Sequence, residues 1–351
     1  MYPRLNIHKE IIAKNAYYLT SFCSRNGISV AGVTKVLCGS LELAEIFLKN
    51  GVKIIADSRV KNLDKIKSNF SQAYTMLIRI PMISELRQAV SVSDCILVSD
   101  IRTLTVISEI SRANGKIPDI VYMVDMGDLR EGVWFEQAVE EIRTACSIRN
   151  INLSGIGTNL GCFGGVLPTV ENMKRLVEIK EKINVSTIRD ISGGSTVTLK
   201  MLEDGVLPKQ ITNLRIGEGI VCGTDATGGR NVPNTLQDTV LLEAEIIEIK
   251  DKPSLPYGET GYDAFGRKHE FINNGIRKKA ILAIGEQDVI SSGMTPLDKN
   301  IKVMHSSSDH TIIDVTDCEN NYCIGDIIGF RLSYGALLRA STSPYVEKIY
   351  K

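Results

Sequence analysis

Short apolar runs alternate with longer amphipathic stretches through the first two-thirds of the chain. In the amphipathic stretches, such as 101–114 and 170–183, apolar residues recur every three or four positions, which predicts helices. The runs between them are nearly continuous in apolar residues, as is typical of parallel strands that are covered on both faces. Eight such runs lie at 28–35, 53–57, 75–80, 95–99, 120–125, 153–159, 188–192 and 213–217.

The number and order of these units predict an N-terminal (β/α)8 TIM barrel. Eight strand-and-helix units in roughly 225 residues match the usual size of such a barrel. A doubly wound open sheet is the competing arrangement, but no G-x-G-x-x-G motif follows the first strand. In a barrel, the carboxyl ends of the strands carry the active site.

The pattern changes after about residue 236, where short alternating or β-branched runs are separated by Gly, Pro, Asn and Asp. Long helical patterns are absent there, so this part is predicted to be an all-β domain. The boundary is expected in the segment TGGRNVPNT, residues 227–235, which is rich in glycine, asparagine and proline. We therefore expect a barrel over residues 1–235 and a C-terminal β domain over residues 236–351.

Composition and charge exclude several classes of partner. Basic and acidic residues are equal in number, 41 each, which argues against a nucleic-acid or anionic-membrane partner. No apolar run is long enough to span a bilayer, and the N-terminus lacks the apolar core of a signal peptide, so a cytoplasmic protein is expected. The eight cysteines form no C-x-x-C and the four histidines are dispersed, so neither a disulfide framework nor a metal site is predicted.

The predicted strand ends carry candidate chemistry. Lys35 ends the first strand, where burying an amine costs free energy unless it is paired or used chemically. The alternative is that Lys35 begins the next loop and points into water. Glycine-rich turns at 192–196 and 215–219 follow the last two strands, where barrels bind phosphate. A lysine together with a phosphate site favours pyridoxal phosphate, although metal-dependent and sugar-phosphate barrels stay open.

Five segments together resemble the motifs of the alanine racemase superfamily, which comprises fold-type III pyridoxal-phosphate enzymes. They are VTK, VDMGDLREG, GIGTNL, NLRIGEG and SSSDHTIIDVTD, and the resemblance covers nearly the whole chain. Members pair an N-terminal barrel with a C-terminal β domain and work as head-to-tail dimers. The resemblance therefore implies the cofactor pyridoxal 5'-phosphate, an amino-acid substrate and a homodimer with shared active sites.

The resemblance also implies roles for individual residues. Lys35 would hold the cofactor as a Schiff base and carry a proton on one face of the substrate Cα. Arg130 would lie near the cofactor phenolate and the substrate carboxylate, and Arg215 would face the pyridine nitrogen. Asn159 stands where a histidine is usual. The implied phosphate contacts are Ser195, Gly217, the backbone of Glu218 and Tyr334, and the implied substrate contacts from the partner subunit are Ser308 and Asp309.

Racemisation needs a second acid or base on the opposite face of Cα. In the family this group is a tyrosine that the β domain of the other subunit contributes in an S-Y-G segment. The segment PYGETGYDAFG offers Tyr257 and Tyr262, and we favour Tyr257 because it keeps the Y-G pair. His310 is the third candidate.

Two departures from the family pattern affect the choice of substrate. Gly39 stands where a tyrosine usually follows the lysine by four residues, and Met123 stands where some members carry a carbamylated lysine. The chain is more similar to the branch of amino-acid racemases that includes ornithine racemase, which implies ornithine or another basic amino acid. A distal ammonium would need a carboxylate, for which Glu259, Asp263 and Asp309 are candidates. The alternative substrate is alanine, or a broad range of amino acids.

Two further functions are compatible with the same cofactor. A fold-type III decarboxylase would use a cysteine of the β domain, where Cys318 and Cys323 lie in a loop-like segment. A non-catalytic pyridoxal-phosphate-binding protein would resemble the barrel alone, so the β domain argues against it.

Overall fold

The computed structural model describes all 351 residues, and the chain forms two compact units. Glu10–Gln237 make one unit, which we call the barrel unit. Met1–Lys9 and Asp238–Lys351 together make the other, which we call the β unit. The expected division at residue 235 places the first nine residues in the barrel, whereas their backbone pairs within the β unit, as described below.

Eight parallel strands of the barrel unit close into a ring. The strands are β2 (Ser29–Val33), β3 (Ile54–Asp57), β4 (Tyr74–Leu77), β5 (Cys95–Val98), β6 (Asp119–Asp125), β8 (Asn152–Gly157), β9 (Asp190–Ser192) and β10 (Asn213–Ile216). Each pairs in parallel with the next in this order, and β10 pairs with β2, which completes the ring. Each predicted strand corresponds to one of these eight, so the predicted barrel is confirmed.

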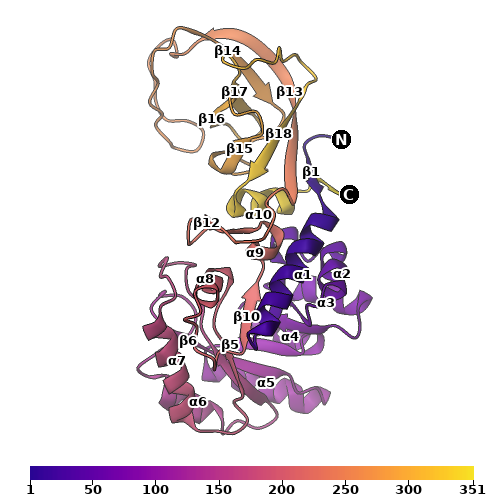
Figure 1. Cartoon of the computed structure of the whole chain (residues 1–351), viewed down its shortest axis with the longest axis vertical. Coiled ribbons are helices and arrows are strands. Elements are labelled where there is room, and N and C mark those ends of the chain that lie inside the picture. The colour runs from indigo at the N-terminus through magenta and orange to yellow at the C-terminus, as the bar shows by residue number, and fades with distance from the viewer. The chain divides into compact units, whose positions relative to one another are not determined.

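Helices follow most of these strands and surround the ring (Figure 1). They are α1 (Lys9–Arg25), α2 (Leu41–Lys49), α3 (Val60–Asn69), α4 (Leu86–Val92), α5 (Ile101–Asn114), α6 (Ala138–Ala145), α7 (Val170–Ile183), α8 (Leu199–Glu203) and α9 (Glu218–Val221). Polar caps fix several starts: the Asp100 carboxylate accepts from the N–H groups of Arg102 and Thr103, and Thr169 forms a capping box with Asn172. No helix of the chain is long and apolar enough to cross a membrane.

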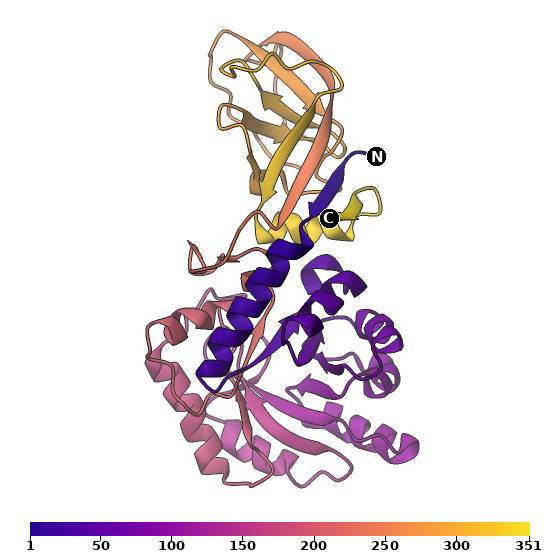
Figure 2. The ribbon, with the colours of Figure 1, turned by 45° about the vertical axis from the view of Figure 1, so that its right-hand side comes forward.

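The interior of the ring is filled by apolar side chains from most of its strands. Small residues such as Ala31 and Ala56 alternate with larger ones such as Met76 and Met123, all of them buried, so the barrel is a packed core. The long helix α1, indigo in Figure 2, is attached to the segment around α9 through Asn15. Its side-chain amide donates to the carbonyl oxygens of Ile220 and Leu236 at 3.1 and 2.8 Å.

Minor elements complete the barrel unit. Single 3₁₀ turns lie at η1 (Lys35–Leu37), η2 (Ile83–Glu85) and η3 (Thr196–Thr198), and the short strand β7 (Val133–Trp134) pairs with β6. Strands β11 (Thr224–Asp225) and β12 (Arg230–Asn231) form a small hairpin. Strand β12 lies inside the predicted boundary segment 227–235 and β11 lies just before it, so that segment is part of a local structure.

The β unit is mainly antiparallel. Its elements are β1 (Arg4–Ile7), β13 (Val240–Pro253), β14 (Ile276–Leu282), η4 (Ser291–Gly293), β15 (Met294–Pro296), β16 (Lys302–Ser306), β17 (Thr311–Asp314), β18 (Ile327–Leu332), α10 (Tyr334–Thr342) and β19 (Glu347–Tyr350). The sheet order is β15-β18-β13-β14-β17-β16. An all-β fold was predicted here, and it is confirmed, with α10 as the one helix that the pattern did not reveal.

The first strand of the chain lies beside the last. Strand β1 pairs antiparallel with β13 and parallel with β19. Leu5 and Ile7 of this strand are fully buried. Burial of these side chains and pairing on both edges explain why the first nine residues belong to the β unit.

Candidate functional site

The carboxyl end of strand β2 holds Lys35 in place. The strand ends at Val33, two residues earlier than predicted, and Lys35 is the half-buried first residue of η1. The preceding residue, Thr34, is fully buried, and its hydroxyl donates to the Asp57 carboxylate at 2.7 Å. Its backbone N–H donates to the Ala56 carbonyl at 2.9 Å. These bonds to the neighbouring strand fix the backbone from which Lys35 extends.

Gly39 explains one departure from the family motif. Its backbone has φ +59°, in the left-handed region that favours glycine. A Cβ atom at this position would lie 2.5 Å from the Cβ of Asn62. The tyrosine that is usual four residues after the lysine therefore does not fit in this backbone.

Arg215, on strand β10, is a buried cation without a salt bridge. Only 5% of the residue is exposed, and none of the salt bridges of the chain includes it. Its guanidinium donates to the Ser192 hydroxyl and to the Thr158 carbonyl, the latter at 2.7 Å, and reaches the Asn159 side-chain oxygen at 3.5 Å. Burial lowers the pKa of Arg215 to about 10, so the guanidinium stays protonated at neutral pH. Only neutral groups form hydrogen bonds with this buried cation, so its guanidinium suits a further hydrogen-bond acceptor from a ligand.

The two glycine-rich turns lie next to this arginine. Gly194, with φ +110°, accepts the backbone N–H of Arg215 on its carbonyl at 2.9 Å. The N–H of Gly219 donates to the Thr196 hydroxyl at 3.1 Å, which joins the two turns. A Cβ on Gly217 would lie 2.9 Å from the Cβ of Val33, so the second turn packs against the strand that leads to Lys35.

The other predicted phosphate contacts of the barrel unit lie in the same turns. Ser195 is half-buried and precedes η3. The side chain of Glu218 is engaged elsewhere, because its carboxylate accepts from the Thr224 hydroxyl at 2.7 Å and from the Ala226 N–H at 2.8 Å. Burial raises the pKa of Glu218. Its backbone is therefore the part that remains for a ligand, as the sequence motif implied.

Arg130 and Asn159 lie in the loops that follow β6 and β8. The Arg130 guanidinium forms two hydrogen bonds with the Glu131 carboxylate, one of them at 2.6 Å. Burial lowers the pKa of Arg130, but the pairing with Glu131 outweighs it and leaves this pKa raised. The Asn159 amide donates to the Cys162 sulfur at 3.1 Å. Glu131 raises the pKa of Arg215 and Arg130 lowers it, so these charged side chains share one electrostatic environment.

Asp128, which the sequence analysis did not single out, joins these two loops. It is fully buried, and its carboxylate accepts four backbone N–H groups at 2.9 to 3.2 Å. The donors belong to the loop after β8: Gly161, Cys162, Phe163 and Val166. Burial alone would raise the pKa of Asp128, but these donors outweigh it and lower the pKa. Asp128 thus positions the loop that contains Asn159 against the loop that contains Arg130.

Replacing Asp128 by asparagine is expected to lower the free energy of unfolding by about 1–3 kcal/mol, because an amide nitrogen cannot accept N–H bonds. A loosened loop should also lower kcat/KM by about tenfold or more, since small misplacements reduce rates strongly. Urea titration at pH 7 and steady-state assays measure the two effects. An unchanged unfolding midpoint would contradict the positioning role.

The pH dependence of the stability difference between Asp128→Asn and the natural chain provides an internal control. The pKa of Asp128 in the folded chain lies below its unfolded value of about 3.9, so its stabilisation is present above that value. It is lost as the pH falls through the folded pKa. The difference in stability between Asp128→Asn and the natural chain should therefore be constant from pH 5 to pH 8 and shrink below about pH 4.

The remaining predicted site residues lie in the β unit. Ser308, Asp309 and His310 form the turn between β16 and β17, where the Asp309 carboxylate accepts from the Ser308 hydroxyl at 3.1 Å and lies 3.0 Å from the His310 ring nitrogen. Tyr257 lies on the long loop 254–275 and is fully exposed.

Tyr262 and Tyr334 are the two other tyrosines predicted for the site, and both lie in the β unit. Tyr262 lies on the same loop as Tyr257 and is 75% exposed. Tyr334 is the half-buried first residue of α10, which the Ser333 hydroxyl caps by accepting the Ala336 N–H. The β unit thus carries Tyr257 and Tyr262 on the long loop and Tyr334 at the start of α10.

Comparisons with known proteins support one family. The family model described as alanine racemase, N-terminal domain, matches residues 7–224. A lysine racemase from Thermotoga maritima is 47% identical over 354 residues, which cover 100% of this chain and 99% of that protein. An ornithine racemase from Acetoanaerobium sticklandii is 38% identical over 352 residues, 99% of each protein.

Solved structures show the same fold at low sequence identity. An alanine racemase from D-cycloserine-producing Streptomyces lavendulae has a TM-score of 0.75 at 14% identity and covers 100% of this chain and 98% of its own. An alanine racemase from Bartonella henselae with covalently bound pyridoxal phosphate has a TM-score of 0.74 at 15% identity, with 99% coverage of both chains. The match to the family model and the two full-length relatives show that the chain belongs to the alanine racemase family.

Proposed function

We propose that this protein is a pyridoxal-phosphate-dependent racemase that interconverts the L and D forms of a basic amino acid, such as lysine or ornithine. The substrate class rests on the two full-length relatives, because both are named as racemases of amino acids with a distal amine. Alanine, or a broad range of amino acids, is the second candidate, since the structural neighbours include alanine racemases.

The barrel mouth fits the cofactor on its own chemistry, and Arg215 is the observation that carries this proposal. Its buried guanidinium lacks a salt bridge and suits an uncharged acceptor such as a pyridine nitrogen. The hydroxyl of Thr158, also buried, has no hydrogen-bond partner in the chain. Ser195, Gly217 and the backbone of Glu218 lie in the two turns where a phosphate would bind, and Tyr334 of α10 would add its hydroxyl.

When bound, the cofactor supplies a covalent link to the substrate amine and withdraws electrons from Cα. The residues of the chain perform the remaining tasks. Lys35 provides the amine that holds the cofactor and moves a proton on one face of Cα. Tyr257 of the partner subunit provides the proton-transfer group on the opposite face. Arg130 would bind the substrate carboxylate, and Asn159 would be among the residues that hold the cofactor.

A homodimer belongs to this proposal. Ser308, Asp309 and Tyr257 all lie in the β unit, on loops at the surface. In the proposed dimer, each β unit completes the active site of the other subunit. The exposure of Tyr257 supports this arrangement, because a fully exposed tyrosine is available to a second chain.

A panel of L-amino acids, each followed by chiral chromatography, tests the function. We expect lysine and ornithine to be racemised with a kcat/KM at least about tenfold above that of alanine, given one charge-assisted contact to the distal amine. Equal rates for all amino acids would support the broad-range alternative. Release of carbon dioxide without racemisation would instead indicate a decarboxylase, and no turnover of any amino acid would overturn the proposal.

A further inference from the structure

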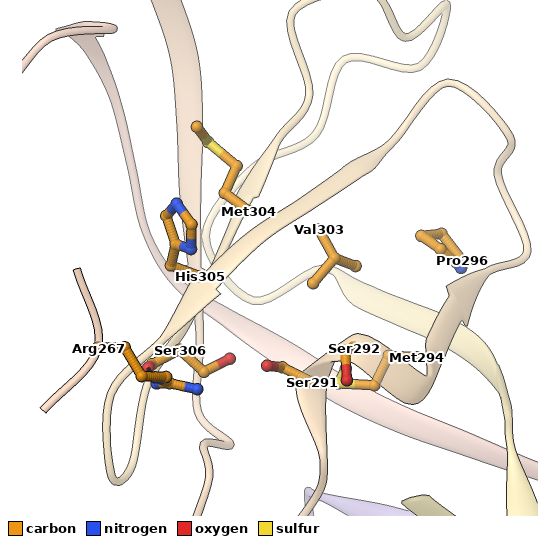
Figure 3. A pocket seen from close by; sticks show the side chains of 9 residues that line it. All are labelled: Arg267, Ser291, Ser292, Met294, Pro296, Val303, Met304, His305 and Ser306. Atoms are coloured by element: carbon orange, nitrogen blue, oxygen red, sulfur yellow. Dashed lines mark hydrogen bonds between the residues drawn. The ribbon is translucent and has the colours of Figure 1, made fainter. Parts of the chain in front are cut away.

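A cavity of about 420 Å³ lies in the β unit, between η4, β15 and β16 (Figure 3). Its volume is in the range of small-molecule sites. Met294, Pro296, Val303 and Met304 contribute apolar wall, while Arg267, Ser291, Ser292, His305 and Ser306 contribute polar groups. Figure 3 shows Arg267, Ser291 and Ser306 near one another on one side of the cavity, and the His305 ring beside Met304. The cavity is therefore amphipathic, with an apolar part and a polar end.

Glu286 lies directly behind the polar end. The residue is only 8% exposed, and the Ser291 hydroxyl donates to its Oε1 at 2.6 Å. The two guanidinium contacts are longer: Arg267 reaches Oε1 at 3.5 Å and Arg339 reaches Oε2 at 3.3 Å. The side chains of these arginines are 42% and 46% exposed, so solvent weakens both contacts. One carboxylate offers about four acceptor positions, and here only the serine contact is short.

The backbone joins Glu286 to the turn that contains Ser308 and Asp309. The N–H of Glu286 donates to the Ser307 carbonyl at 2.8 Å, and the N–H of Gln287 donates to the Ser308 carbonyl at 2.9 Å. A Cβ on Gly285 would lie 2.5 Å from the Asp309 nitrogen, so no side chain fits between the two segments. Glu286 is thus held at a fixed position beside the turn that the proposed function places at the substrate.

The other carboxylates of this region are less suited to bind a substrate cation. Asp263 already accepts from the Arg267 guanidinium at 2.9 Å and lies 2.8 Å from the His269 ring nitrogen. Asp309 is engaged with its two neighbours in the turn, and Glu259 is exposed on the long loop. Asp288 accepts from the buried Ser343 hydroxyl at 2.6 Å. Among these carboxylates, Glu286 combines burial with long contacts to two arginines, and two of its partners, Arg267 and Ser291, line the cavity.

From these contacts we infer that Glu286 binds the distal ammonium of a basic amino acid and selects such substrates over neutral ones. This inference rests on the proposed function. The ammonium takes the place of Arg267 beside Oε1 and also contacts the Ser291 hydroxyl. Arg267 keeps its bonds to Asp263 and to the Ser306 carbonyl, at 2.9 and 3.1 Å, so its own charge stays paired. The apolar wall accommodates the methylene groups of the side chain.

The test is the Glu286→Gln variant, assayed with lysine, ornithine and norleucine, which has a side chain of similar length to lysine but no charge. The kcat/KM for lysine and ornithine should fall about 10- to 100-fold, mainly through a higher KM, because a charge-assisted contact is lost. The value for norleucine should stay within about twofold, because norleucine has no ammonium and makes no charge-assisted contact that the substitution could remove. A Glu286→Asp variant, which keeps the charge, should retain part of the preference for lysine.

Asp288→Asn serves as the matched control, because it neutralises another buried carboxylate two residues away. It should change kcat/KM for all three substrates by the same factor. An equal loss for lysine and norleucine in Glu286→Gln would overturn the inference while leaving the racemase function intact. If the natural protein racemises none of the three, the proposed function fails, and the inference fails with it. If Glu286→Gln does not fold, the ratio of lysine to norleucine in Glu286→Asp decides: an unchanged ratio overturns the inference.

Discussion

Replacing Lys35 by alanine is expected to lower kcat/KM for racemisation at least about 10⁴-fold, the scale of loss when a covalent catalytic group is removed. The proposed role gives this amine two tasks, holding the cofactor and transferring a proton on one face of Cα. Its backbone is fixed by the bonds of Thr34 to the neighbouring strand, so alanine should leave the fold unchanged. Chiral chromatography of the product and circular dichroism of the variant measure the two effects.

Lys65 provides a matched control for Lys35. This exposed lysine donates to the Cys38 carbonyl at 3.2 Å, close to η1 in the sequence, and has no proposed catalytic task. Lys65→Ala should keep racemase activity within about twofold, as is usual for surface substitutions. Borohydride reduction of the natural protein with added pyridoxal phosphate, followed by peptide mapping, should label Lys35. A label on another lysine, or full activity of Lys35→Ala, would contradict the assignment.

Replacing Tyr257 by phenylalanine is expected to lower racemisation about 10²- to 10⁴-fold, the usual contribution of one positioned acid or base. The variant should still exchange the Cα hydrogen of one enantiomer with D₂O, because Lys35 continues to serve one face. The variant should therefore lose racemisation while it keeps hydrogen exchange. An unfolded variant would lose both. Tyr257 is fully exposed, so stability should change by less than about 0.5 kcal/mol. Proton NMR in D₂O measures the exchange.

The two other candidates for this role provide the comparison. Tyr262→Phe and His310→Gln should each retain racemisation within about threefold, since neither loses the proposed proton-transfer group. If one of these variants instead shows exchange without racemisation, that residue is the opposite-face group. Equal loss of exchange for both enantiomers in Tyr257→Phe would assign Tyr257 to substrate binding and not to proton transfer.

The barrel could be predicted because its strands follow a simple physical rule. Parallel strands covered on both faces are continuously apolar, so runs such as 95–99 and 120–125 stand out from the amphipathic stretches between them. Strands β1 and β19 have only four residues each, and their partners lie far away in the sequence. Helix α10 is nine residues long, and no apolar stripe of three or four turns marks it. Such short elements are defined by tertiary pairing.

The candidate site was predictable where a residue lies at the end of a barrel strand. Lys35 and Arg215 follow from strand order, because β2 and β10 are neighbours in the ring. Asp128 and Glu286 were not predicted as site residues. The contacts of Asp128 come from donors more than 30 residues away, and those of Glu286 include Arg339 and the β16–β17 turn. No local motif encodes such contacts, although Asp128 lies inside the motif VDMGDLREG.

The pairing of β1 with β13 and β19 has a consequence for biosynthesis. Ile7 pairs with Val240, so the N-terminal strand is synthesised more than 230 residues before its first partner. At about 5–20 residues per second, the ribosome needs about 12–47 s to make that stretch. The barrel segment is complete earlier and is flanked on both sides by segments of the β unit. The β unit can therefore fold only after the entire barrel has been translated. A nascent chain that stalls before β13 is made leaves β1 with unpaired strand edges that chaperones can recognise.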